Sequence, residues 1–117
     1  MEKFWLHDPE KHDYPAAADY LELLFIREEA EKMVAALKSA KTVTKKAKDI
    51  LRASALPLLA DTNIHVRGDM KRVKRGKKLS PILLVRFQYK LIIADGYHRV
   101  CASYYLSEDE DVPCRLI

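Results

Sequence analysis

The chain has 117 residues, of which 49% are apolar and 32% are charged, and its formal net charge is +4. These values are typical of one globular domain with a single packed core, so we take residues 1–117 as one domain. No run of about 18 apolar residues exists, and charges interrupt the apolar stretch at the N-terminus, which excludes a membrane span and argues against a signal peptide. We therefore expect a cytoplasmic protein that does not act at a membrane.

The cysteines and histidines argue against a disulfide scaffold and a metal site. Cys101 and Cys114 are the two cysteines, and both lie in apolar surroundings, so we predict reduced thiols in the core. The four histidines are scattered along the chain, and no Cys-x-x-Cys or His-x-x-x-His spacing joins them. We expect no bound metal in a dedicated site.

The N-terminal part, residues 1–55, is predicted to be helical. Residues 1–14 read as an irregular arm whose aromatic side chains fold back on the core. Apolar residues at steps of three and four predict an amphipathic helix from Ala16 to about Ser39, with a break near Arg27. A second helix is expected from about Val43 to the residues before Pro57, with Thr42 or Thr44 as its cap. The two helices are predicted to form an antiparallel pair.

The C-terminal part, residues 56–117, combines helices with strands. A third helix over about residues 63–75 is expected to follow a cap at Asp61 or Thr62 and to end at Gly76. Apolar runs at 81–87 and 91–94 predict a hairpin buried on both faces, followed by a helix over 96–106 and a strand over 112–117. The fold class is thus α+β, with N-terminal amphipathic helices packed on a small mixed β-sheet.

The corner after the second predicted strand carries the clearest indication of chemistry. Asp95 and Gly96 end the strand, and Tyr97, His98 and Arg99 open the next helix. Glycine lets a ligand approach the backbone, and free N–H groups at a helix start attract anions. Arginine can hold two phosphate oxygens at once, and a histidine can act as donor, acid or base near neutral pH. The corner is therefore predicted to bind a phosphate.

Each of these residues also has a purely structural interpretation. Asp95 is as well suited to cap the helix as to contact a ligand, and it is also suited to orient His98 or to hold a metal ion. Arg99 can form a structural ion pair with Asp95 or with the acidic residues 108–111. Tyr97 can stack on a base, but packing in the core is the favoured interpretation.

The stretch Ile93-Ala94-Asp95-Gly96-Tyr97-His98-Arg99, set between a hairpin and a helix, resembles the corner of the ParB/sulfiredoxin superfamily. Many members carry an Asp-Gly-His-His-Arg-like sequence there, and the resemblance covers about residues 80–117. It implies a ParB/sulfiredoxin-like fold in which Gly96, His98 and Arg99 contact phosphates. Tyr97 stands where sulfiredoxins have their reactive cysteine, which argues against sulfiredoxin chemistry.

Three functions follow as hypotheses, and whether the protein is an enzyme stays open. The first is a phosphate- or nucleotide-binding domain, including a small nucleotide hydrolase or phosphotransferase, with a nucleotide and Mg²⁺ as the expected ligand. Its candidate catalytic residues are Asp95 and His98, and its candidate phosphate-binding residues are Gly96, Tyr97, His98 and Arg99.

The second hypothesis is a DNA- or RNA-binding module, because a short segment concentrates positive charge. Its candidate residues are Lys71, Arg72, Lys74, Arg75, Lys77 and Lys78. The structural alternative is that these side chains form a solvated helix face. The run also contains no aromatic residue on which a base could stack. The third hypothesis is a non-catalytic interaction protein, such as a partner in a small bacterial operon or an antitoxin-like subunit, whose long amphipathic N-terminal helix packs against another chain. A homodimer is a further possible assembly.

Overall fold

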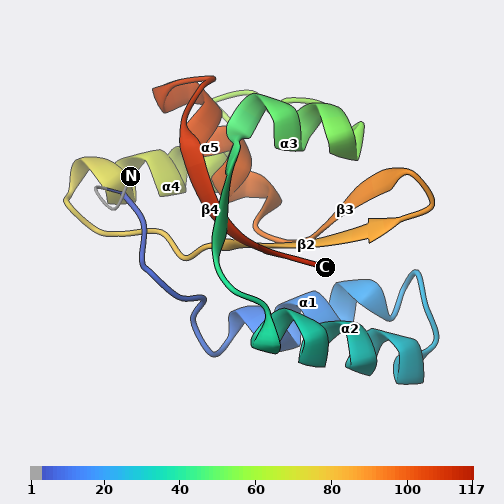
Figure 1. Ribbon diagram of the computed structural model, residues 1–117. Coiled ribbons are helices and arrows are strands. Elements are labelled where there is room, and N and C mark those ends of the chain that lie inside the picture. Colours follow the sequence, from blue (N-terminus) through green and yellow to red (C-terminus); the bar gives the residue numbers. More distant parts are fainter. Residues whose placement is uncertain (1–3) are drawn as a thin grey trace.

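The structure is a computed structural model, and it describes residues 4–117. Five helices and a four-stranded mixed sheet make up this part of the chain, so the predicted α+β class is confirmed (Figure 1). In chain order the elements are α1 (Asp13–Leu21), α2 (Arg27–Ser39), β1 (Val43–Lys46), α3 (Ala47–Ser54), α4 (Ile64–Lys74), β2 (Ile82–Phe87), β3 (Lys90–Asp95), α5 (Tyr97–Leu106) and β4 (Asp111–Leu116). No helix within residues 4–117 is long and apolar enough to cross a membrane.

The sheet has the order β1-β4-β2-β3. β1 pairs with β4 and β2 pairs with β3 in antiparallel fashion, whereas β2 and β4 run parallel. The β2–β3 hairpin was predicted from the sequence and is confirmed. Its two-residue turn places Gln88 and Tyr89 at positive φ, +50° and +63°, which is the backbone of a type I′ turn.

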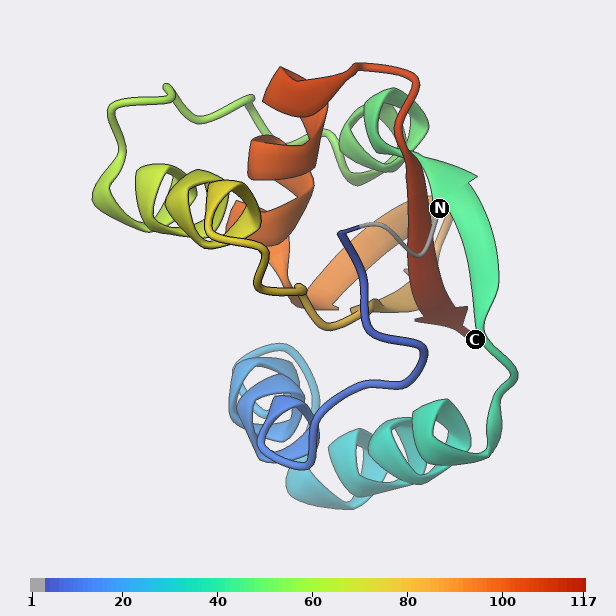
Figure 2. The ribbon, with the colours of Figure 1, turned by 90° about the vertical axis from the view of Figure 1, so that its left-hand side faces the viewer.

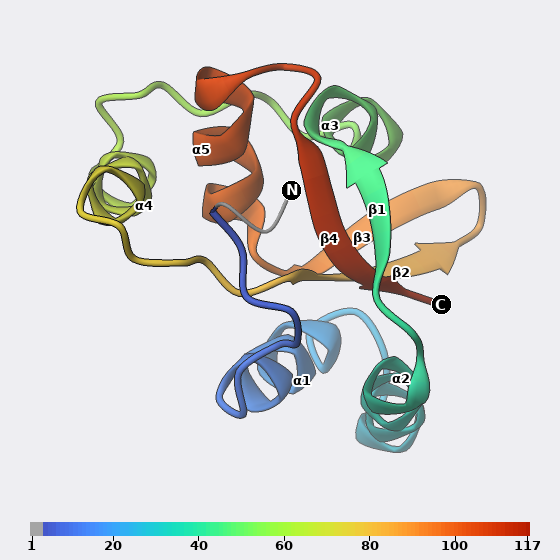
Figure 3. The ribbon, with the colours of Figure 1, turned by 60° about the vertical axis from the view of Figure 1, so that its left-hand side comes forward.

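Helices cover both faces of the sheet (Figures 2 and 3). α1 and α2 cover one face, where Leu83 and Val85 of β2 join their apolar cluster. α3, α4 and α5 lie on the other face, where Ile82 and Leu84 of β2 join a second cluster. The continuous apolar run of β2 therefore packs in two directions at once, as predicted for a strand that is buried on both faces.

The N-terminal arm and the region around α4 follow the sequence closely. Trp5 is 1% exposed and forms an isolated β-bridge with Leu79, so the arm folds back on the core as expected. Gly76 follows α4 at φ +78°, which is the backbone of the predicted helix end. The cap of α4 is Asn63 rather than Asp61 or Thr62, because the Asn63 side chain accepts from the amides of His65 and Val66.

The segment 43–54 differs most from the prediction. Its first four residues form the edge strand β1, with Val43 opposite Cys114, and α3 begins only at Ala47. The apolar spacing of this segment fits a helix, but backbone pairing with β4, far along the chain, outweighs that local preference. The antiparallel helix pair is also different: α1 packs on α2, with the predicted break at residues 22–26, while α3 lies on the opposite face of the sheet.

Candidate functional site

The corner between β3 and α5 is built around Gly96. Its φ is +108°, a region that other residues rarely adopt. A Cβ atom placed here would lie 2.6 Å from Ile82 Cδ1 and 2.9 Å from Arg99 Nη2. Glycine is therefore required both by the backbone and by the arginine that lies against it.

The Arg99 side chain lies within this corner and is only 16% exposed. Its Nη2 donates to Asp95 Oδ2 at 3.0 Å and to the Pro81 carbonyl at 3.2 Å, and it lies 3.9 Å from Asp13 Oδ1. Its Nε is buried and has no hydrogen-bond partner among residues 4–117. The structural ion pair that the sequence left open for Arg99 is thus present.

Asp13 is an unexpected member of this cluster. It is 1% exposed, and its Oδ2 accepts from the Glu10 amide at 2.9 Å. Nothing in the sequence separated this residue from the other acidic residues of the N-terminal arm. Through Asp13, the start of α1 is joined electrostatically to the β3–α5 corner.

The Asp95 carboxylate faces Arg99 and does not cap α5. Gly96 is the residue at the cap position, and no side chain among residues 4–117 accepts from the first amides of the helix, so the capping interpretation of Asp95 is wrong. Burial raises the pKa of Asp95, and the nearby Asp13 adds to this, while Arg99 opposes it. Asp95 is therefore held by Arg99, and the N–H groups at the start of α5 are left uncapped by side chains.

A cleft of about 500 Å³ opens between α4 and the corner. From α4 it is lined by residues at helical spacing, including His65, Asp69 and Arg72, and from the corner by residues 95–96 and 98–99. The His65 and His98 rings lie 4.8 Å apart between centroids, with a tilt of 49°. This meeting of two histidines from separate elements is the most distinctive feature of the cleft.

The charges that line the cleft balance one another closely. The two arginines Arg72 and Arg99 face the two carboxylates Asp69 and Asp95, and burial raises the pKa of Asp69. Burial, followed by the neighbouring His65 and then Arg99, lowers the pKa of His98 below the usual histidine value. The charge of the cleft near neutral pH therefore depends on whether His98 carries a proton.

Tyr97 and most of the basic run do not line this cleft. The Tyr97 side chain packs against the larger core cluster, and its hydroxyl donates to the Pro57 carbonyl. Of the six cations at 71–78, Arg72 lines the cleft. The other five are exposed: Lys71, Lys74, Arg75, Lys77 and Lys78.

The sequence predicted half of this cleft. Gly96, His98 and Arg99 were identified from the corner motif, whereas His65 and Asp69 were missed. Their signal was present, because residues 65, 69 and 72 fall on one side of the predicted helix at steps of four and three. Within residues 4–117, no group of three or more histidine, cysteine, aspartate and glutamate side chains is placed to hold a metal ion.

Comparisons with protein-family models, curated proteins and solved structures found no match to this chain. The resemblance of the corner to the ParB/sulfiredoxin superfamily therefore stays a prediction from the motif. The function has to be argued from the geometry of the cleft.

Proposed function

We propose that this domain binds a phosphate group, as part of a nucleotide or another phosphorylated ligand, in the cleft between α4 and the β3–α5 corner. The observation that carries the proposal is the placement of His65 and His98 side by side in a cleft that Arg72 also lines. The N-terminus of α5, which has no side-chain cap, adds N–H donors and the positive end of a helix dipole at the same place.

The proposal changes the role of Arg99. Its guanidinium already binds Asp95 and the Pro81 carbonyl, so it is a positioning residue that holds the corner in shape. Arg72 is 51% exposed, and its nearest ionic partner is Asp69 at 3.9 Å, a loose contact. Arg72 is therefore the arginine that is available to turn towards a phosphate.

The charge balance makes binding depend on pH. With both arginines matched by carboxylates, an anion gains most when His98 is protonated. Because the pKa of His98 is lowered, the free protein holds this residue neutral at pH 7, and a bound phosphate raises that pKa again. Affinity for phosphate is therefore expected to rise as the pH falls through the pKa of His98.

Any reaction at the cleft would rest on the histidines rather than on Asp95. A neutral His98 can accept a proton from an attacking hydroxyl group or water, whereas the Asp95 carboxylate is engaged by Arg99. The cleft holds only two carboxylates, Asp69 and Asp95, among its described lining residues, so Mg²⁺ would be held chiefly by the phosphates of a bound nucleotide. We propose binding of the phosphorylated ligand only, and its hydrolysis has to be measured separately.

Binding is tested by titrating pyrophosphate and nucleoside triphosphates, with and without Mg²⁺, and recording the shift in Tm. A stabilising shift is expected for the wild type, reduced at least about tenfold in apparent affinity in His98→Ala and in Arg72→Met. His7→Ala is the matched control, since His7 is exposed and does not line the cleft. No shift with any of these ligands, or equal shifts in all variants, contradicts the proposal.

A second candidate function uses the outer face of α4. Lys71, Lys74 and Arg75 are exposed and, by helical spacing, share a face with Arg67 that adjoins the cleft without lining it. Such a stripe would bind nucleic-acid phosphates with an affinity that falls steeply as salt increases. A gel-shift assay with DNA and RNA at low salt tests this, and the triple change of Lys71, Lys74 and Arg75 to Gln should abolish any retardation.

A further inference from the structure

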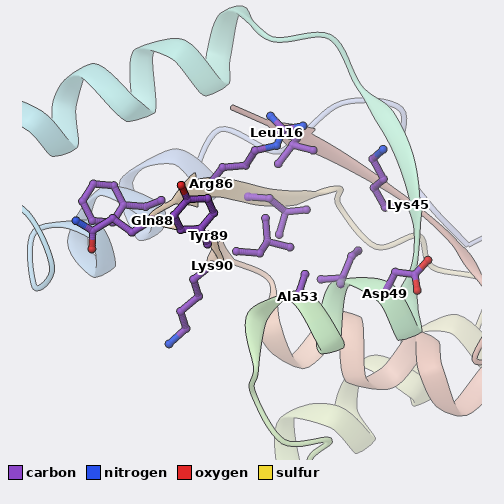
Figure 4. Close-up of a pocket in the computed structure, with 12 residues that line it drawn as sticks. Lys45, Asp49, Ala53, Arg86, Gln88, Tyr89, Lys90 and Leu116 are labelled. Atoms are coloured by element: carbon purple, nitrogen blue, oxygen red, sulfur yellow. The ribbon is translucent and has the colours of Figure 1, made fainter.

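The tip of the β2–β3 hairpin borders an apolar groove that the proposed phosphate site does not use. It lies between α3 and the sheet and has a volume of about 570 Å³. Ile50 and Ala53 of α3 face Leu84, Leu91 and Leu116 of the strands across it. In Figure 4, Lys45 and Asp49 stand at one end of the groove, and Gln88, Tyr89 and Lys90 stand at the other.

The edge of this groove is positively charged. Lys45, Arg86 and Lys90 line it, together with a single carboxylate, Asp49. None of the three cations forms an ion pair with another residue in the described part of the chain (residues 4–117), which leaves them available to an acidic partner. The groove is thus suited to an apolar segment that is flanked by negative charge.

The chain carries such a segment in the turn between α1 and α2. Leu23 is 80% exposed and Ile26 is 69% exposed, both large apolar side chains in water. Glu22 opens the segment, and Glu28 and Glu29 lie in the first turn of α2. Its one cation, Arg27, lies 3.7 Å from Glu22 and 3.9 Å from Glu31, so the segment stays acidic overall. This acidic apolar turn, residues 22–29, is complementary in both charge and polarity to the groove.

The turn is held close to the hairpin but outside its own groove. Phe25 packs edge-on against Phe87, with ring centroids 4.8 Å apart, which fixes the turn beside the hairpin tip. The hairpin tip, the C-terminal end of α3 and the turn all gather at one end of the molecule (Figure 1). A twofold axis at this end would bring the turn of each copy to the groove of the other.

We propose that two copies of this chain form a symmetric dimer in which the acidic apolar turn of each copy occupies the groove of the other. Leu23 and Ile26 supply the buried apolar contact, and Glu28 and Glu29 meet Arg86 and Lys90 of the opposite copy. Because both elements lie at the same end of the molecule, each copy can give its turn and receive the other's, and the contact closes at two chains. This inference is independent of the proposed phosphate site, which lies at the open end of the hairpin, away from its tip.

The dimer is tested by measuring mass against concentration, using analytical ultracentrifugation. The wild type is expected to dimerise, and Leu23→Glu with Ile26→Glu is expected to weaken the dimer at least about tenfold, because two charges would enter an apolar groove. A chain that stays monomeric up to about millimolar concentration overturns the proposal.

A charge-reversal pair decides whether the groove receives this turn. The variant Arg86→Glu with Lys90→Glu reverses the groove, and the variant Glu28→Lys with Glu29→Lys reverses the turn, so each alone should be monomeric. Mixed together they should form a heterodimer, because both contacts then join opposite charges. Lys71→Glu with Lys74→Glu on α4 is the matched control and should dimerise as the wild type does.

Each result of the mixing experiment has a definite meaning. A heterodimer of the two reversed variants supports the reciprocal contact, whereas variants that dimerise alone as tightly as the wild type overturn it. Loss of dimerisation in both variants without recovery on mixing also overturns it, and it would direct the search to a different partner for the groove. Circular dichroism spectra equal to that of the wild type verify that these exposed substitutions leave the fold intact.

Discussion

The two ends of the β2–β3 hairpin are stabilised in opposite ways. At the open end, buried charged groups hold the corner, with Arg99 between Asp95 and Asp13 and against the Pro81 carbonyl. At the tip, Phe87 and Tyr89 are exposed beside the cations Arg86 and Lys90, and Tyr89 stands on a left-handed backbone. At the open end the buried charges pair with one another, so the phosphate binding that we propose rests on the two histidines and Arg72. At the tip the exposed aromatic side chains, with cations that are unpaired within residues 4–117, suit the dimer contact that we propose.

The largest effect is expected from Gly96→Ala at the open end. The added Cβ would meet Ile82 and the Arg99 guanidinium and would force a strained backbone, which together cost about 4 kcal/mol of unfolding free energy. Gly76→Ala is the matched control, because its φ is also positive but nothing lies within 4 Å of the added atom. It should cost about 1 kcal/mol. Urea unfolding measures both, and equal losses would show that the corner is not tightly packed.

Removing the central cation is the next largest change. Arg99→Met leaves Asp13 and Asp95 buried without their cation, and about 3 kcal/mol of unfolding free energy should be lost near pH 7. Part of this loss should be recovered in acid, where the carboxyl groups are protonated. Arg72→Met, at a half-exposed position, should cost less than about 1 kcal/mol. If both changes have the same small effect, Arg99 does not hold the corner.

The hairpin tip should respond in the opposite direction. Changing Gln88 to Asn and Tyr89 to Gly supplies residues that favour the left-handed turn, so the isolated chain should gain about 1 kcal/mol. The comparison between the two ends would fail if this variant lost stability, since Tyr89 would then make contacts that hold the tip together. Such a gain would show that the natural turn residues are less stable in this turn than Asn and Gly.

The pH dependence of stability gives a finer test of the open end. The pKa of Asp95 is raised in the folded protein, so the folded state binds this proton more tightly than the unfolded state does. The stability gained in this way is fully present below the ordinary aspartate pKa and is lost as the pH rises through the raised pKa. Asp95→Asn should therefore flatten the decline of stability with rising pH, measured by urea unfolding at several pH values. A steeper decline in the variant would contradict the assignment.

The sequence predicted the fold well where local patterns and tertiary structure agree. The hairpin, α4, α5 and the last strand follow from apolar runs and turn residues, and Gly76 marked its helix end. β1 could not be predicted, because a four-residue edge strand depends on its distant partner β4. The corner half of the candidate site could be predicted because its residues are contiguous in sequence. His65 and Asp13 could not be predicted, because they reach the corner only through the packing of α4 and α1. Distances between elements that are remote in sequence are not encoded in any short motif.

The most direct test of the phosphate cleft is a histidine NMR titration. The ring protons of all four histidines are followed against pH, with and without pyrophosphate. We predict that pyrophosphate raises the pKa of His98 and moves the ring signals of His65, while the ring signals of His7, which does not line the cleft, stay unchanged. Equal responses of all four histidines, or no response at His98, would contradict phosphate binding at the β3–α5 corner.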